Sequence, residues 1–269
     1  ELHMTDVEFQ RIVTYVKNTS GIDLSQKRVL IKGRLTNYLV QNGYNSYNEY
    51  MNEVESDITK KKAEELINIL TTNHTYFMRE FEHLDFLRKV VLPELKEKEK
   101  SRRDLHIWCG ASSTGEEPYT IAMVLKDFFG LEHNMWDTRV LATDLSTRVL
   151  EHAQKGIYLK EQIAPLPENW RRRYFKMLNQ DEYQVKQELK NEVIFRQFNL
   201  MEPLPFKRPL HVVFLRNVMI YFDDETKRNL VDRIYDVMVP GGYLFIGASE
   251  ALYRPNTSFK FVRPSVYRK

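Results

Sequence analysis

Cysteine is nearly absent from this chain of 269 residues, which contains only Cys109. One thiol cannot form a disulfide framework or a thiolate metal cluster within the chain, so we expect a reducing compartment, the cytoplasm. The 7 histidines do not fall at metal-ligand spacings. Together these absences predict a protein without a metal site.

Long apolar runs and a large excess of charge are missing as well. No stretch is long enough to span a bilayer and no signal peptide is recognisable, so we expect no membrane insertion. The net charge of +3 gives no electrostatic footprint for a nucleic-acid duplex. The opening Glu-Leu-His-Met resembles a cloning remnant, and we expect native numbering to begin near Met4 or later.

The first part of the chain shows amphipathic helices. Thr5 with Glu8, and Ser46 with Glu49, form capping-box patterns before apolar residues at helical spacing. Between them, Ser25 is a candidate cap for a further helix. We expect an all-α domain over 5–72, then a linker and connecting helix over 73–104.

From residue 105 to residue 269 the pattern alternates between strand and helix. We predict strands at 105–109, 139–143, 193–198, 210–215 and 243–248, and helices at 116–128, 146–154, 166–175 and 224–238. This alternation is typical of an α/β fold with a mostly parallel sheet. A short extra strand is expected at 183–186, and an antiparallel edge strand at 259–267.

The most informative segment is the turn after the first of these strands. Small residues follow Cys109 and lead into a helix that begins with Glu116 and Glu117. A strand, a tight turn and a helix N-terminus together form a place where α/β folds bind nucleotide-like ligands. Two carboxylates would repel a phosphate, whereas they suit a cation with an ammonium and a sulfonium, such as S-adenosylmethionine. The turn therefore favours a methyl donor.

Polar residues follow three further strands, at the edge where ligands bind in open α/β sheets. Asp144 ends the second strand; its carboxylate suits a ribose diol, which we favour, or a cap for the next helix. Asn199 and Leu200 suit an adenine edge and face, or form a simple turn. Asn217 follows the fourth strand, where a buried amide needs partners that a ligand could supply.

Several motifs occur together, in one order, in a known family. They read Thr71-Thr-Asn-His-Thr-Tyr-Phe-Met-Arg-Glu80, Ser113-Thr-Gly-Glu-Glu-Pro-Tyr119, Ala142-Thr-Asp144, Asn199-Leu200 and Arg216-Asn-Val-Met-Ile-Tyr-Phe222. Over nearly its whole length the chain resembles the CheR-type chemotaxis receptor methyltransferases. The resemblance implies methyl transfer from S-adenosylmethionine to glutamate side chains on the helical cytoplasmic domains of chemoreceptors. It also implies a Rossmann-like methyltransferase domain with an inserted β-subdomain, here at about 174–195, behind the helical domain.

The resemblance also assigns roles to particular residues. It implies that Asn73, Thr75 and Arg79 reach over the donor from the linker. Glu116 is expected to face the methionine end of the donor, Asp144 its ribose, and Asn199 with Leu200 its adenine. Arg216 and Asn217 are expected to complete the pocket, and Tyr221 to stand near the transferred methyl group. A glutamate acceptor is ionised near pH 7, so the site needs no general base and mainly aims and desolvates two partners.

Two of these residues are candidates for the transfer step itself. The guanidinium fork of Arg79 suits orientation of the substrate carboxylate; its other possible role is an ordinary ion pair with Glu80 or Glu82. Tyr221 either restricts the surroundings of the methyl group or packs in the core beside Phe222.

The inserted segment departs from part of the family. Members that dock on a receptor's C-terminal tether peptide have a longer, glycine-containing turn in the β-subdomain, whereas this chain has no glycine between Gly156 and Gly241. We therefore predict that the protein does not depend on a tether peptide.

A basic stretch lies in the helical domain. No acidic residue occurs from 24 to 48, while Lys27, Arg28, Lys32 and Arg34 fall within one predicted helix. The stretch is either a solvated face or a docking face for the acidic helices around receptor methylation sites. With the resemblance, docking is favoured.

Three other functions agree less well with the sequence. A non-catalytic S-adenosylmethionine-binding regulator is disfavoured because the candidate catalytic residues are all retained. A methyltransferase for nucleic acid or a small molecule is disfavoured because the Asn/Asp-Pro-Pro-Tyr motif of nucleic-acid amino-methylases is missing where Arg216 and Asn217 stand. No Gly-x-Ser-x-Gly elbow occurs, which argues against a serine hydrolase.

Overall fold

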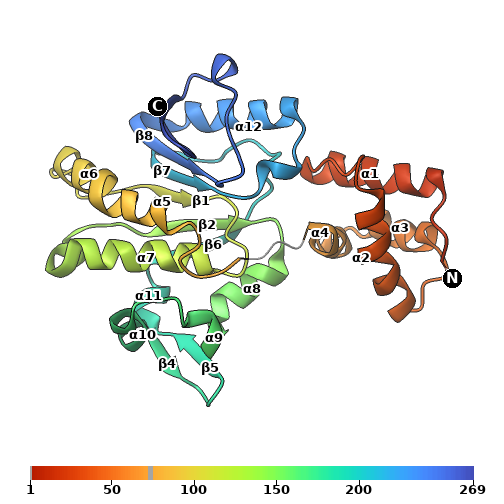
Figure 1. Ribbon diagram of the computed structural model, residues 1–269, viewed down its shortest axis with the longest axis horizontal. Coiled ribbons are helices and arrows are strands. Elements are labelled where there is room, and N and C mark those ends of the chain that lie inside the picture. Colours follow the sequence, from red (N-terminus) through yellow and green to blue (C-terminus); the bar gives the residue numbers. More distant parts are fainter. Residues whose placement is uncertain (1, 72–74) are drawn as a thin grey trace.

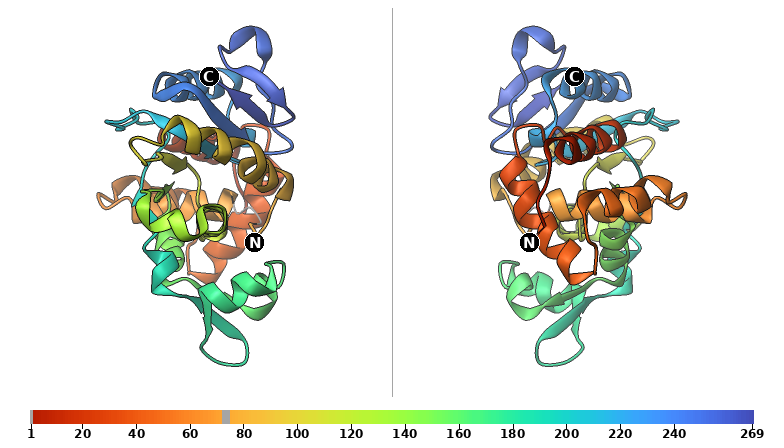
Figure 2. Two further views of the ribbon diagram at one scale, coloured as in Figure 1. Left: turned by 90° about the vertical axis from the view of Figure 1, so that its left-hand side faces the viewer. Right: turned by 90° about the vertical axis from the view of Figure 1, so that its right-hand side faces the viewer.

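The computed structural model describes residues 2–71 and 75–269. Figure 1 shows a helical N-terminal part beside a larger α/β part, with a small sheet projecting from the latter. Figure 2 shows the same parts from two sides. Within the described residues, no helix is both long and apolar enough to cross a membrane.

The N-terminal part packs its helices around a single apolar core. Its helices are α1 (Asp6–Ser20), α2 (Arg28–Gln41), α3 (Tyr47–Ser56) and α4 (Lys61–Thr71). The predicted capping box of α1 is confirmed, because the Thr5 hydroxyl accepts from the Glu8 amide and the Glu8 carboxylate accepts from the Thr5 amide. Gly21, at a φ of +76°, ends the helix in the left-handed conformation that favours glycine.

Two of the cap predictions need correction. The side chain of Ser25 does not cap α2, which begins at Arg28 after an N-cap residue, Lys27, that makes no side-chain cap. The Ser25 amide instead donates to Asp23 Oδ1 over 2.9 Å, so a local turn takes the place of the cap. Ser46 does cap α3, but the Glu49 carboxylate accepts from the Asn45 amide rather than closing the box on Ser46.

The large sheet contains all the strands that the alternation predicted. Its order is β6-β2-β1-β7-β8-β10-β9. The strands are β1 (Ile107–Cys109), β2 (Val140–Asp144), β6 (Val193–Gln197), β7 (Leu210–Leu215), β8 (Met238–Ile246), β9 (Lys260–Arg263) and β10 (Val266–Arg268). The first five run parallel, and β10 pairs antiparallel with β8. The carboxyl ends of five strands therefore meet at one edge.

Alternating side chains of these strands face two separate cores. Ile107, Cys109 and Phe214 pack with residues of α7 (Glu116–Phe129) and of the connecting helix, whereas Trp108 and Val213 pack with residues of α12 (Asp224–Asp236). The connecting helix consists of α5 (Phe81–Phe86), a π-helical turn (Leu87–Val91) and α6 (Leu92–Lys98). Both faces of the sheet are thus covered, which explains why its central strands read as continuous apolar runs.

The remaining elements form the small sheet and its surroundings. After α8 (Thr147–Lys155) come β3 (Ile157–Leu159), α9 (Lys160–Ile163), α10 (Glu168–Tyr174), β4 (Phe175–Met177), β5 (Glu182–Val185) and α11 (Gln187–Lys190). The small sheet has the order β3-β5-β4. It therefore takes its first strand from a segment N-terminal to the predicted 174–195, and β6 belongs to the large sheet. Three-residue β3 is too short to show a periodic pattern.

Candidate functional site

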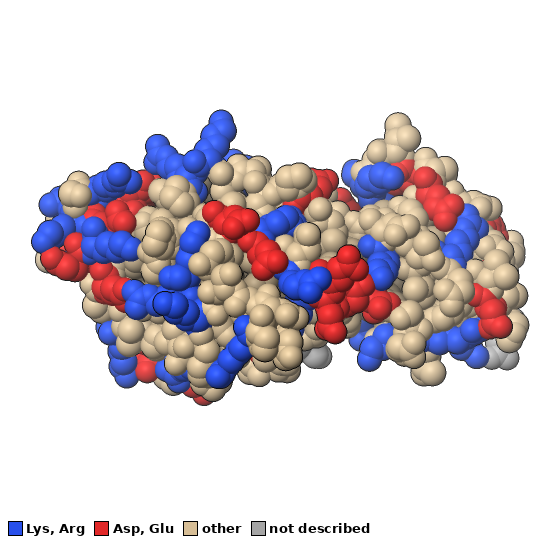
Figure 3. Space-filling view, turned by 90° about the horizontal axis from the view of Figure 1, so that it is seen from above, with Lys and Arg blue, Asp and Glu red and all other residues tan. Residues whose placement is uncertain are grey.

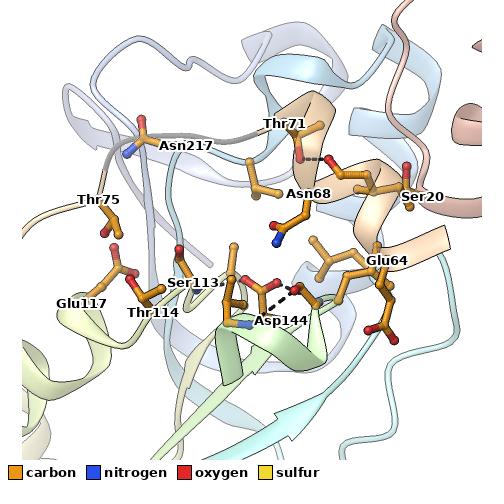
Figure 4. Close-up of a pocket in the computed structure, with 18 of the residues that line it drawn as sticks. Ser20, Glu64, Asn68, Thr71, Thr75, Ser113, Thr114, Glu117, Asp144 and Asn217 are labelled. Atoms are coloured by element: carbon orange, nitrogen blue, oxygen red, sulfur yellow. Dashed lines mark hydrogen bonds between the residues drawn. The ribbon is translucent and has the colours of Figure 1, made fainter. Parts of the chain in front are cut away.

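A cavity of about 560 Å³ lies at the carboxyl edge of the large sheet. It is lined by the segments that follow β1, β2, β6 and β7, by the linker before α5, by the end of α1 and by one side of α4. Figure 4 shows Asp144 and Asn68 on opposite walls, with Thr75, Glu117 and Asn217 at one end and Ser20 and Glu64 toward the other. The helical domain therefore supplies part of the wall.

The turn after β1 is shaped by Gly115. This residue precedes α7 at a φ of +101°, and a Cβ there would stand 2.7 Å from Tyr158 Oη and 2.9 Å from Ala153 Cβ. Both the backbone conformation and the space therefore require glycine. The tight turn brings the first turn of α7, with its two glutamates, to the wall of the cavity.

Glu116 is a buried carboxylate at the wall of the cavity. Its side chain is 2% exposed, and the Thr114 hydroxyl donates to its two oxygens over 2.6 and 2.8 Å. Burial raises the pKa of Glu116 to about 7, against the lowering effect of the Thr114 hydrogen bond. A cation placed in the cavity would restore the charged form, so this position suits a positively charged ligand.

Glu117 takes part in a buried ion pair that the sequence reasoning did not foresee. Its Oε2 lies 2.8 Å from Arg216 Nε, and its Oε1 accepts from Cys109 Sγ over 3.1 Å. Burial, with Glu117 adjacent, raises the pKa of the Cys109 thiol well above its ordinary value. Arg216 also donates from Nη1 to the Arg79 carbonyl over 3.0 Å. Arg216 thus ties the end of β7 to both α7 and the linker.

Asp144 is held by the backbone around it. Its Oδ2 accepts from the Ser113 amide over 2.9 Å and its Oδ1 from the Ser146 amide over 3.0 Å. The cap of α8 is the Ser146 hydroxyl, which accepts from the Val149 amide, so the alternative role of Asp144 as a helix cap is wrong. Because a carboxylate has about four acceptor positions, both oxygens keep capacity for a diol in the cavity.

Asn199 and Leu200 line the cavity after β6. The Asn199 amide is engaged within the protein, since Nδ2 donates to the Thr19 carbonyl over 2.6 Å and Oδ1 accepts from the Met201 amide over 3.0 Å. The structure therefore assigns this side chain to the junction between the two domains, and it leaves the apolar Leu200 as a candidate contact for a base.

The linker and the end of β7 meet over the cavity. Asn217 stands in the left-handed region at a φ of +62°, and the Arg79 guanidinium lies 5.7 Å from the centre of the Tyr76 ring. Glu80, one of the two carboxylates expected as alternative ion-pair partners of Arg79, pairs with Arg216. Tyr221 lines the cavity and also packs against the core of the helical domain, so both roles weighed for it have a structural basis.

Every predicted site residue that the structure describes reaches this one cavity. They are Thr75, Arg79, Glu116, Asp144, Asn199, Leu200, Arg216, Asn217 and Tyr221. Asn73 lies outside the described residues. The sequence reasoning missed Glu64 and Asn68, which come from α4. Their only sequence signal was a polar side chain on a helix whose apolar face is elsewhere, which is not specific.

Glu64 joins the two domains beside the cavity. Its carboxylate accepts from the amide and the hydroxyl of Thr147, over 3.1 and 2.6 Å, and from the side-chain amide of Gln197. Further junctions are the Asn199 bond to the Thr19 carbonyl and the hydrogen bond from the Asp23 amide to the Tyr221 carbonyl over 2.7 Å. Residues that line the cavity therefore connect the two domains at several points.

The fold and the cavity define a class of protein. A mostly parallel sheet covered on both faces, with a cavity beyond the carboxyl ends of its strands and an acid after the second strand, is typical of Rossmann-like domains that bind a nucleoside-containing ligand. Glu116 adds a buried carboxylate suited to a cationic group, and Asp144 an acceptor suited to a ribose.

Comparison with known sequences then gives the family. A family model described as "CheR methyltransferase, SAM binding domain" matches residues 73–268, and one described as "CheR methyltransferase, all-alpha domain" matches residues 7–71. The chemotaxis protein methyltransferase of Borreliella burgdorferi is 40% identical over 100% of this chain and 96% of its own length. That of Escherichia coli is 35% identical over 99% of this chain and 92% of its own length.

The chain belongs to the CheR methyltransferase family. It is an S-adenosylmethionine-dependent methyltransferase of chemotaxis, and the predicted cofactor is confirmed. Among solved structures, the DhpI–SAH complex aligns at 13% identity over 71% of this chain and 72% of that chain with a TM-score of 0.34, which is too loose a match to add detail.

Proposed function

We propose that this enzyme methylates glutamate side chains on the helical cytoplasmic domains of chemoreceptors. The observation that carries the proposal is the convergence of the predicted donor and acceptor residues on one cavity. S-adenosylmethionine, when bound, supplies a methyl group on a sulfonium centre. A glutamate carboxylate is a sufficient nucleophile near neutral pH, so the protein has to bind, aim and desolvate, and it needs no general base.

The donor side of the site is proposed to use two carboxylates for two different groups. Glu116 holds the cationic methionine end. Its carboxylate is buried, and among the described residues the side-chain hydrogen bonds that it accepts come from the Thr114 hydroxyl, which carries no charge to balance it. Asp144 accepts from the ribose hydroxyls with the acceptor capacity that its two backbone bonds leave over. Leu200 packs on the adenine, while Asn199 secures the segment that carries it.

The acceptor side is proposed to use Arg79 and Tyr221, with Thr75 and Asn73 of the linker over the donor. Arg79 presents a guanidinium at the cavity wall, and this group suits orientation of an incoming carboxylate. Tyr221 limits the space around the methyl group from the opposite segment, after β7. Arg216 is buried and paired with Glu117, so its part is to fix the linker and the end of β7 in place.

The exposed side of α2 is the proposed docking face for the receptor. Lys27 and Lys32 are exposed. Arg28 pairs with Asp6 over 2.5 Å, and Arg34 donates to the Leu70 carbonyl over 3.0 Å. The two lysines are therefore the residues on which we base electrostatic docking, and the two arginines also stabilise the domain.

Independence from a tether peptide is also part of the proposal. The turn between β4 and β5 is short and is closed by Asn179, whose Oδ1 accepts from the amides of Asp181 and Glu182, each over 2.9 Å. These two hydrogen bonds hold the turn together without a glycine, which distinguishes it from the longer glycine-containing turn of tether-dependent members. A calorimetric titration with a receptor-tail peptide is expected to show no binding; micromolar affinity at the β-subdomain would refute this part of the proposal.

The nature of the substrate is tested with purified enzyme, tritiated S-adenosylmethionine and receptor-containing membranes. We expect label on the receptor that is released by mild base, as a carboxylic ester would be, and loss of labelling when the receptor glutamates are changed to alanine. A parallel titration with S-adenosylhomocysteine reports donor-site binding. Binding without transfer would indicate a regulator, and stable label on another group would indicate a different substrate.

On the surface seen in Figure 3, basic and acidic side chains of the described residues are interspersed. A protein that follows a duplex gathers its basic residues into a continuous track along the phosphates. The charge arrangement on this face therefore supports a protein acceptor over a nucleic acid.

A further inference from the structure

Glu250 is a buried carboxylate that does not line the cavity and that no site prediction included. The residue is 5% exposed and lies in the segment that follows β8. Oε1 accepts from the amides of Asn217 and Gly247 over 2.7 and 2.8 Å, and Oε2 accepts from the amide of Met219 over 2.9 Å. One side chain thus gathers three backbone donors from the ends of two strands.

These contacts fix the loop that carries Asn217 and Tyr221. Asn217 is in the left-handed region, which costs a non-glycine residue free energy unless neighbouring contacts hold it there. Gly247 leaves no room on the other side, because a Cβ there would collide with the Asn217 side chain and stand 2.7 Å from Glu250 Oε1. The carboxylate and the glycine together define where Asn217 stands.

The same short turn also holds the linker. The amide of Ala248 donates to Glu80 Oε1 over 2.8 Å, and Glu80 Oε2 lies 3.4 Å from Arg216 Nη1. Arg216 Nη1 in turn donates to the Arg79 carbonyl. The turn from 247 to 250 therefore contacts both segments that approach the acceptor side of the cavity, the linker and the loop after β7.

We propose that Glu250 is a positioning residue for methyl transfer: through its three backbone bonds it holds Asn217 and Tyr221, and through its turn it sets the loop against the linker that carries Arg79. This inference rests on the proposed function. The residues proposed to hold the methionine end, the ribose and the adenine of the donor, Glu116, Asp144 and Leu200, lie in segments after β1, β2 and β6, whereas the hydrogen bonds of Glu250 run to the segments after β7 and β8. Its effect therefore falls on the transfer step more than on donor binding.

The test is the substitution Glu250→Gln, which keeps the size of the side chain. The glutamine amide group would face backbone N–H donors with a donor of its own, so at least one of the three bonds is lost. Because small displacements of reacting groups are costly, we expect kcat to fall about 10- to 100-fold. The KM for the donor and the affinity for S-adenosylhomocysteine are expected to change less than about threefold, because a loss of positioning lowers kcat without removing ground-state binding.

Glu8→Gln is the matched control. Glu8 is also 5% exposed and also accepts from backbone amides, those of Thr5 and Asn48, but it lies in the helical domain away from the cavity. We expect it to lower thermal stability without lowering kcat of the folded enzyme. Gly247→Ala is the second test variant, since its Cβ presses on Asn217 and Glu250 from the other side, and it should reproduce the loss of kcat.

The outcomes separate this inference from the proposed function. If Glu250→Gln and Gly247→Ala, measured at equal folded fractions, retain the kcat of the Glu8→Gln control, Glu250 has no positioning role. If they lose donor affinity in proportion to kcat, their effect is on the whole pocket and the inference is also overturned. Failure of the wild-type enzyme to methylate receptor glutamates would instead refute the proposed function.

Discussion

The burial of Glu116 suits the binding of a cationic ligand but lowers the stability of the ligand-free fold. Its pKa is raised from 4.5 to about 7 because burial disfavours the charge. Below pH 4.5 the folded and unfolded chains both hold the proton, so there is no penalty. As the pH rises toward 7 the unfolded chain ionises first, and stability falls until the folded group ionises too.

The stability of the ligand-free protein should therefore depend on this one carboxyl. Glu116→Gln is expected to be more stable than wild type at pH 8, by up to about 3 kcal/mol from a shift of this size. At pH 4.5 the two proteins should be nearly equal. Urea unfolding at the two pH values measures the difference, and a constant difference across pH would show that the charge of Glu116 is not the cause.

Ligand binding should show the opposite dependence on pH. Because a cation prefers the ionised form of Glu116, wild-type affinity for S-adenosylhomocysteine is expected to rise about tenfold between pH 5.5 and 7, as linkage to one proton requires. The ligand's own amino group stays protonated over this range. Calorimetry on Glu116→Gln should show weaker binding and little of this dependence; an unchanged slope would place the titrating group elsewhere.

For individual residues, the sequence predicted which side chains reach the cavity, but it did not predict which other side chains they contact. Asp144 and Glu116 were recognisable because each follows a strand or turn with a strong local pattern. The Arg216–Glu117 pair and the Asn199 bond to Thr19 join residues 99 and 180 positions apart, which no local pattern can reveal. The site roles themselves stay predictions until ligand is bound.

The basic residues of α2 and of its N-cap allow a direct test of electrostatic docking to the receptor. Lys27 and Lys32 are exposed, and acidic receptor helices would be attracted by them. The double reversal Lys27→Glu/Lys32→Glu is expected to lower the initial rate of receptor methylation at least tenfold at low salt, and less at high salt. Affinity for S-adenosylhomocysteine should not change.

A matched control for α2 is available in the same domain. Lys60 and Lys61 belong to a basic run at the start of α4 that we interpret as solvated surface, and both are exposed. Lys60→Glu/Lys61→Glu makes the same change in net charge. If both double variants slow methylation equally, the effect is one of overall charge and α2 is not a docking face.

Elements with a clear period were predictable, and short ones were not. The strands of the large sheet and helices α1, α7 and α12 agree with their predicted positions to within a few residues, because each has a continuous apolar run or an amphipathic stripe. Strand β3 was missed because three residues give no period. The start of α2 was misplaced because a serine suited to a cap was used in a turn instead.

The molecule as a whole has a binding cavity that belongs to both of its parts. Glu64 of α4 accepts three hydrogen bonds from Thr147 and Gln197, which lie in the same segments as Asp144 and Asn199, respectively. The arrangement makes cavity shape dependent on how the domains meet. A sequence cannot give this relation, because the contacting residues lie in segments that fold separately; the predicted division at residues 72 and 104 also stays a prediction.

Loosening this junction should weaken donor binding. Glu64→Ala removes all three bonds from a buried position, and we expect a loss of about 1–3 kcal/mol in stability together with weaker binding of S-adenosylhomocysteine. Glu55→Ala, which removes the more exposed pair with Arg11 inside the helical domain, should cost less than about 1 kcal/mol and leave affinity unchanged. Equal affinities for the two variants would show that the junction does not shape the cavity.

The sealed position of Cys109 has a practical consequence. Its sulfur is buried behind α7 and its proton is held against Glu117, so alkylating reagents, which need an accessible thiolate, should pass it by in the folded protein. As the chain has no other cysteine, one introduced at an exposed site such as Lys27 would accept a fluorophore or spin probe selectively, with the native residue left in place. Site-specific labelling for single-molecule spectroscopy therefore needs one substitution and no removal of a native cysteine.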